Sequence, residues 1–218
     1  MNNKGNTVTT KGLTQLALFS ALIIIMAFVP FLGYIPLGFT RATIIHIPVI
    51  IGSLMLGAKK GAVLGGVFGL TSLINNSINP TITSFVFTPF YSLGDYSGGW
   101  QSLVICFVPR ILIGVVPFYV YRLIVKSNKD SKGPSVTGLV AAGLSGALTN
   151  TLLVMNMIYL FFGNSYAAAR EVAADTIYKV ILSVITINGI PEAIVAAIIV
   201  SLVGKVIMNK KVMDNIGA

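Results

Sequence analysis

Three ionisable side chains, His46, Arg110 and Glu192, lie within apolar stretches of this sequence. On insertion scales a charged side chain at the centre of a bilayer costs about 2.5–3.5 kcal/mol, so such residues face the interior of a helix bundle and find polar partners there. Arg110 and Glu192 could form a buried ion pair between two helices, or either could contact a ligand directly. His46 could likewise belong to a binding site or to the packed interior.

A proline precedes each of the two strongest charges. Arg110 follows Pro109, and Glu192 ends a run that begins with Asn188 and includes Pro191. Pro191 has no amide hydrogen and therefore leaves a carbonyl one turn earlier without its helical partner. Inside a membrane such a carbonyl is tolerated only where another protein group bonds it or where it lines a cavity. We therefore predict that residues 188–192 line a cavity; the alternative is a kink that serves packing.

Amide and hydroxyl side chains extend the candidate set. Asn156 and Tyr159 are three residues apart and share a helix face, with Asn150 a little off that face. A buried amide can join two helices as readily as it can bind a ligand. The candidate substrate-binding residues are His46, Arg110, Asn150, Asn156, Tyr159, Asn188 and Glu192 in apolar stretches, together with Arg41, Asn75, Asn76, Phe87 and Tyr91 in the connections.

The elements that must position these residues are membrane-spanning helices. Of the 218 residues, 55% are hydrophobic and only 10% are charged, and the mean hydropathy is +0.88. Soluble domains carry about 25% charged residues, and a run of about 20 apolar residues crosses a bilayer core. We predict an all-α integral membrane bundle, a single transmembrane substrate-binding domain over residues 1–218, with six helices at roughly 13–29, 42–56, 61–74, 103–125, 136–162 and 180–207.

The fifteen basic residues give a net charge of +9, yet their placement argues against a nucleic-acid partner. They lie between the predicted helices at alternate ends and form no continuous basic face that could follow a phosphate backbone. One side of the predicted bundle carries eleven of them and the other side three, while Arg110 lies inside a helix. By the positive-inside rule the side with eleven is cytoplasmic, which places both termini in the cytoplasm.

The longest connection on the predicted outer side, residues 75–99, mixes amides and hydroxyls with a series of aromatic residues. Phe85, Phe87, Phe90 and Tyr91 require apolar surface to cover, which a flexible linker would not supply. We therefore predict that this connection folds over the outer mouth of the bundle as a lid. The alternative is a belt of aromatic residues at the membrane interface.

The sequence contains no pattern typical of an enzyme. There is no Walker loop, no nucleophile with a histidine base and no cluster of metal ligands. The single cysteine, Cys106, excludes a disulfide within the chain. We predict a protein without catalytic activity, cofactor or metal, so energy for any transport must come from another subunit or an ion gradient.

Several segments resemble one known family. They are the small residues Ala17 and Ala21 in the first predicted helix, HIPVIIGSLMLG at 46–57, KGAVLGGVFGL at 60–70 and NGIPEAIVAA at 188–197. In their order and spacing, over nearly the whole chain, these segments are similar to the substrate-binding S components of energy-coupling factor (ECF) transporters, which import vitamins in bacteria.

The resemblance implies how the parts work together. A vitamin would bind near the outer surface of the bacterial cell membrane, between the last three helices, under loops at residues 30–41 and 75–99. The small face of Ala17 and Ala21 would dock on an EcfT-like transmembrane coupling subunit that carries two ATPases, EcfA-like and EcfA′-like. The S component would then reorient in the bilayer and carry its vitamin inward.

Within the family, the chain is most similar to the pantothenate-binding members. The segments that carry this similarity are FLGYIPLG at 31–38, RATIIH at 41–46, the Asn79-Pro80 pair and FVFTPF at 85–90. Pantothenate has a carboxylate, an amide and two hydroxyls, which suit arginine, asparagine and hydroxyl side chains. Riboflavin, pyridoxine and hydroxymethylpyrimidine are the alternative vitamins. An alternative of another class is a stand-alone proton-coupled carrier in which His46 and Glu192 relay protons.

Overall fold

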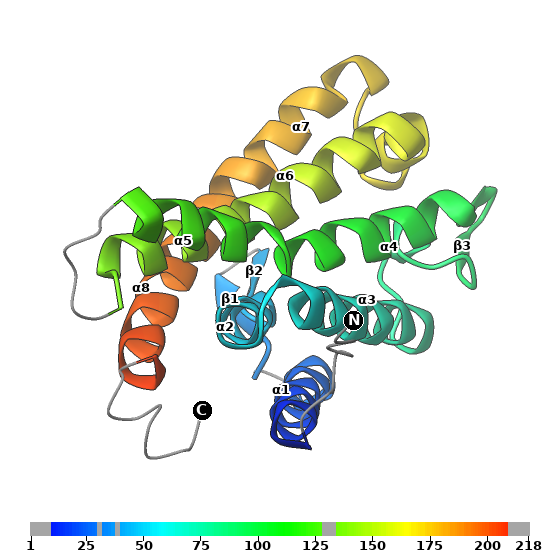
Figure 1. Cartoon of the computed structure of the whole chain (residues 1–218). Coiled ribbons are helices and arrows are strands. Elements are labelled where there is room, and N and C mark those ends of the chain that lie inside the picture. The colour runs from blue at the N-terminus through cyan, green and yellow to red at the C-terminus, as the bar shows by residue number, and fades with distance from the viewer. Residues whose placement is uncertain (1–9, 30–31, 38–39, 128–133, 209–218) are drawn as a thin grey trace, which may run out of the picture.

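The computed structural model describes residues 10–29, 32–37, 40–127 and 134–208. Helices dominate it (Figure 1). They are α1 (Thr10–Phe28), α2 (His46–Leu56), α3 (Ala58–Ile78), α4 (Trp100–Ile113), α5 (Val116–Ser127), α6 (Val136–Ala169), α7 (Ile177–Val184) and α8 (Ile190–Ile207). Two short antiparallel hairpins, β1 (Tyr34–Leu37) with β2 (Thr40–Thr43) and β3 (Ser92–Leu93) with β4 (Tyr96–Ser97), lie in connections.

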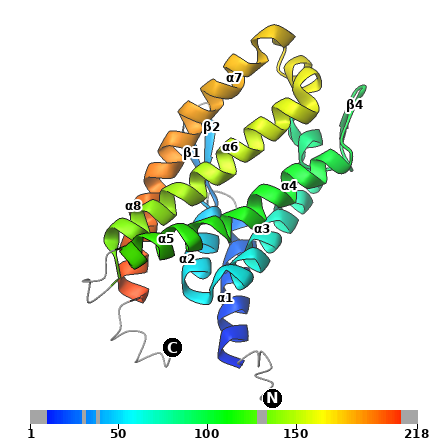
Figure 2. The same ribbon diagram turned by 45° about the horizontal axis from the view of Figure 1, so that its top comes forward.

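Among the described residues, five helical stretches are long and apolar enough to cross a membrane, and α2 is a shorter apolar helix. The predicted all-α membrane class is therefore confirmed. The five stretches are Thr10–Phe28, Ala58–Ile78, Trp100–Lys126, Val136–Ala169 and Ile177–Ile207. In the bundle, α3 lies beside α4, and α6 lies beside both α5 and α8 (Figures 1 and 2).

Local sequence explains where several helices begin and end. A single residue, Gly57, joins α2 to α3, and its φ of 89° is a backbone conformation that suits glycine. Helices α2 and α3 therefore form a tight helical hairpin. At the start of α6, the Ser135 side-chain oxygen accepts a hydrogen bond from the Gly138 amide at 3.2 Å, a standard N-cap.

Two predicted spans differ from the structure in their backbone. The second was expected to begin at 42, but residues 40–43 pair with β1 and α2 starts at His46. The fourth predicted span was expected to be one continuous helix. It breaks between α4 and α5, at residues 114 and 115, shortly before Pro117. Pro117 has no amide hydrogen to bond the Ile113 carbonyl, and the Gly114 and Val115 amides bond carbonyls three residues back instead.

The sixth span runs from α7 into α8 through a π-helical turn, η3 (Ile185–Gly189), that ends just before Pro191. The backbone perturbation predicted before this proline is therefore confirmed. Insertions of this kind widen a helix locally and frequently mark functional sites. Here the turn carries Asn188.

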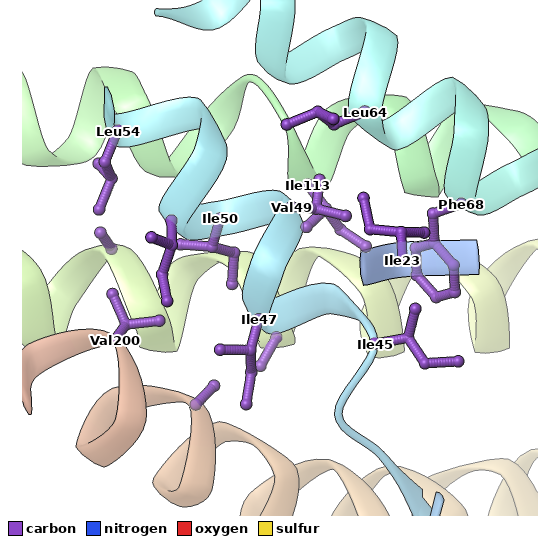
Figure 3. Packing of buried hydrophobic residues seen from close by; sticks show 14 of the residues in the cluster. Ile23, Ile45, Ile47, Val49, Ile50, Leu54, Leu64, Phe68, Ile113 and Val200 are labelled. Carbon is purple, nitrogen blue, oxygen red and sulfur yellow. The ribbon is translucent and has the colours of Figure 1, made fainter. Parts of the chain in front are cut away.

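The main apolar core packs α1, α3, α6 and α8 around the short buried helix α2 (Figure 3). Ile23, Val49 and Ile50 are fully buried there, and Leu64 of α3 and Val200 of α8 contact the same cluster. A second cluster joins α4, α6 and α7 to the connection after α3, with Phe85 fully buried in it. Two separate cores leave room between them for polar residues.

Glycines bring α3 and α4 into close contact. A Cβ atom at Gly61 would collide with the Gly114 carbonyl, and one at Gly65 would collide with the Arg110 carbonyl. The close approach of α3 therefore fixes the backbone position of Arg110. Gly66, the next residue along, faces open space.

Replacing Gly65 by alanine should therefore destabilise the folded protein, by about 1–3 kcal/mol if the cost matches other overpacked cores. The matched control is Gly66→Ala, which adds the same methyl group where nothing lies within 4 Å. Thermal unfolding in detergent should show a lower midpoint for Gly65→Ala alone. Equal midpoints for the two variants would contradict the close α3–α4 contact.

Candidate functional site

Two adjoining cavities lie between the two apolar cores. The first has a volume of about 440 Å³ and the second about 530 Å³. Five residues line both of them: Thr43, Thr81, Phe87, Arg110 and Asn150. The first cavity extends between the ends of α1 and α3, and the second extends between α6 and the α7–α8 segment. The ligand sites of many proteins fall in this size range.

Arg110 stands on α4 at the junction of the two cavities, with only 7% of its surface exposed. Its Nη1 donates a hydrogen bond to the Ile105 carbonyl at 2.8 Å. The guanidinium also lies over two aromatic rings, with its central carbon 5.3 Å from the centroid of Phe87 and 5.7 Å from that of Phe68. These contacts orient a fixed positive charge toward the cavities.

Glu192 faces the second cavity from the first turn of α8 and is 6% exposed. One carboxylate oxygen accepts a hydrogen bond from the Thr43 amide at 2.7 Å, and the other accepts a longer one from the Thr151 hydroxyl at 3.4 Å. The carboxylate thus connects the end of β2, the middle of α6 and the start of α8. Arg110 and Glu192, predicted either to pair or to contact a ligand, lie on the walls of the same cavity.

Asn150 and Asn188 supply hydrogen-bond acceptors to the second cavity. The Oδ1 atom of each is buried and has no hydrogen-bond partner among the described residues. A buried acceptor without a partner costs about 1–3 kcal/mol. A ligand that donates from a hydroxyl or an amide would compensate this cost at both positions.

The connection between α3 and α4 closes part of the first cavity. Asn75 and Asn76 line it from the end of α3, which extends to Ile78, four residues beyond the predicted end. Asn76 is also structural, because its Oδ1 accepts from the Ser84 hydroxyl and its Nδ2 donates to the Ser72 carbonyl, both at 2.8 Å. Ser84 begins the 3-10 turn η1 (Ser84–Val86).

The aromatic residues of this connection separate into different environments. Phe87 lines both cavities, whereas Phe85 is fully buried against Phe162 and Tyr96. Tyr91 packs against the second core and lies outside the lining of the cavities, and Phe90 is 77% exposed. The connection is therefore held against the bundle by Phe85 while Phe87 faces the cavity.

Besides Tyr91, three predicted residues lie outside the lining of the two cavities. Asn156 is exposed and donates to the Leu152 carbonyl of its own helix, and the Tyr159 ring meets the Tyr178 ring edge to face, with 5.2 Å between the two centroids. These two do share a face, but it points away from the cavities. His46 is fully buried in the interior and lines neither cavity. Arg41 belongs to β2, and its side chain lies outside the described part of the structure.

The lining of the second cavity also includes residues that the sequence did not single out, among them Thr43, Thr151 and Arg170. Arg170 was assigned to a connection because the fifth span was expected to end at 162. In the structure α6 kinks at Phe162, where φ is −130°, and continues to Ala169. The run of three alanines at 167–169 favours a helix and was the sequence signal that could have predicted this continuation.

Helix α1 contributes to the first cavity and also presents an exposed face. Ala27, Phe28 and Val29 at its end line the cavity. Ala17 and Ala21, predicted to contact a coupling subunit, are both exposed on the surface of the same helix.

The chain is similar to known proteins over most of its length. A family model described as "ECF transporter, substrate-specific component" matches residues 11–204. The chain is 37% identical over 190 residues to the "Pantothenic acid transporter PanT" of Lactococcus lactis subsp. cremoris, covering 84% of this chain and 92% of that protein. It is 30% identical over 212 residues to the "Pantothenate transporter PanT" of Leuconostoc mesenteroides, covering 95% and 94% respectively.

The family match spans most of the chain, and the helices are those of a multi-pass protein of the bacterial cell membrane. The family consists of transporter subunits that are not enzymes. This chain therefore belongs to the substrate-specific components of ECF transporters.

Proposed function

We propose that this chain binds pantothenate with high affinity and delivers it to an ECF-type, ATP-driven importer. The observation that supports the ligand most directly is the similarity, over most of the chain, to two proteins named as pantothenate transporters. In this proposal the chain itself hydrolyses no ATP. An EcfT-like coupling subunit and two ATPases, EcfA-like and EcfA′-like, supply the energy, and the loaded chain reorients in the bilayer to release its ligand inward.

The chemistry of the cavity walls supports the same ligand. Pantothenate has one carboxylate, for which Arg110 is the nearest fixed positive charge at the junction of the cavities. Its amide and hydroxyl groups are the donors that the buried oxygens of Asn150 and Asn188 require. The Glu192 carboxylate is a further acceptor for a hydroxyl group. Exclusion of water by Phe87 and the connection after α3 would strengthen each polar contact.

The direct test is calorimetry of the detergent-purified chain against pantothenate, riboflavin, pyridoxine and hydroxymethylpyrimidine. We expect one tight, stoichiometric interaction, with pantothenate. Tight binding of another vitamin would keep the transporter role and replace the ligand. Uptake by the purified chain alone in liposomes, driven by a pH gradient, would instead favour a stand-alone carrier and contradict the proposed dependence on ATPase subunits.

A further inference from the structure

Arg170 is a second arginine on the wall of the second cavity, and unlike Arg110 it is exposed to solvent. It caps the carboxyl end of α6, which stops there because Glu171 adopts a left-handed conformation with φ of 56°. The turn between α6 and α7 lies at the end of the molecule opposite the start of α1 (Figure 2). Arg170 therefore stands at the rim of the cavity.

The side chain of Arg170 is held in place by the cavity wall. Its Nη2 donates to the Tyr166 hydroxyl at 3.0 Å, and the guanidinium lies over the Tyr166 ring, 5.3 Å from its centroid. Tyr166 is 3% exposed and lines the same cavity. A stacked guanidinium loses little further conformational freedom when it meets an anion, and it keeps unused donors for one.

The wall beyond the rim is apolar. Val154, Met155, Ile158 and Val184 line the second cavity together with the deeper polar residues. A carboxylate that crosses such a surface gives up part of its hydration, which is costly unless a positive charge is close. One arginine at the rim and another at the inner junction provide a positive charge at both ends of this passage.

We propose that Arg170 is the entry residue for the anionic ligand: it attracts the carboxylate at the rim and raises the association rate, while Arg110 holds the bound ligand. This inference rests on the proposed function, because it requires a ligand with a negative charge. Clefts lined by charges of one sign raise association rates by factors of 10 to 10³; because the Glu192 carboxylate also lines this cavity, the lower end of that range applies. Removal of this single charge should lower the association rate of pantothenate about tenfold at low ionic strength.

The test compares Arg170→Gln with Lys179→Gln in nanodiscs. Lys179 is an exposed cation of α7 that lies outside the lining of the cavities, so its loss removes the same formal charge without changing the rim. Rapid filtration with radiolabelled pantothenate gives the association and dissociation rates. Parallel measurements use pantothenol, the neutral analogue with an alcohol in place of the carboxylate. Salt at about 0.01 M and about 0.15 M changes the Debye length from about 30 Å to about 8 Å.

We expect Arg170→Gln to slow association of pantothenate at low salt, less so at 0.15 M salt, and to leave its dissociation and both rates of pantothenol unchanged. Lys179→Gln should behave like the unsubstituted protein. An unchanged association rate, or a loss confined to faster dissociation, would overturn the entry role while leaving the proposed function intact. Failure of the unsubstituted protein to bind pantothenate would overturn both.

Discussion

Replacing Arg110 by alanine should weaken ligand binding by roughly tenfold or more, the loss expected for a charge-assisted contact in a buried site. Arg110 is 7% exposed, lines both cavities and is oriented by Phe68 and Phe87. Its removal would leave the ligand carboxylate desolvated without a fixed positive charge. Calorimetry with pantothenate measures the change in affinity, and thermal unfolding shows whether the variant is folded.

Two further variants separate charge from geometry. Arg110→Lys keeps the charge but loses the planar guanidinium that lies over the Phe68 and Phe87 rings, so its affinity should be intermediate. Arg122→Ala removes an exposed arginine of α5 that lies outside the lining of the cavities and should leave affinity unchanged. Unaltered affinity in a folded Arg110→Ala variant would assign Arg110 a structural role.

Hydropathy predicts much of this fold, because the bilayer demands apolar helices of a fixed length. The same demand makes polar residues inside those helices informative. Arg110, Asn150, Asn188 and Glu192 were selected on that ground, and all four line the second cavity. Pro191 likewise marks the π-helical turn that carries Asn188.

The incorrect site predictions arise where the sequence of a helix does not distinguish its buried face from its exposed face. The spacing of Asn156 and Tyr159 shows that they share a face, but α6 is apolar all round, so the pattern does not tell which face is inward. Arg170 was missed because its place on the wall depends on how far α6 continues past the kink at Phe162. The β1–β2 hairpin was not predicted, because it depends on pairing between two strands. Residues 42 and 43 of β2 could equally begin a helix when the sequence is considered alone.

Substitutions on the exposed face of α1 should have a large effect on uptake. Adding bulk with Ala17→Leu and Ala21→Leu together should reduce uptake by about tenfold or more while leaving ligand affinity unchanged. Both alanines are exposed, four residues apart, and small residues at this spacing allow close approach of a partner helix in a membrane. The cavity-lining end of α1 begins six residues beyond Ala21, at Ala27.

Uptake is measured in proteoliposomes that contain the coupling subunit and both ATPases, and pantothenate affinity is measured on the same variant alone. Gly66→Leu is the matched control, because it adds the same kind of side chain at a half-buried position of α3, where a Cβ atom would meet nothing within 4 Å. If α1 is the docking helix, only the variant with both Ala17→Leu and Ala21→Leu loses uptake and co-purification with the coupling subunit. Normal uptake by that variant would place the docking surface on another face. A parallel loss of affinity would show instead that the substitutions distort the cavity through the far end of α1.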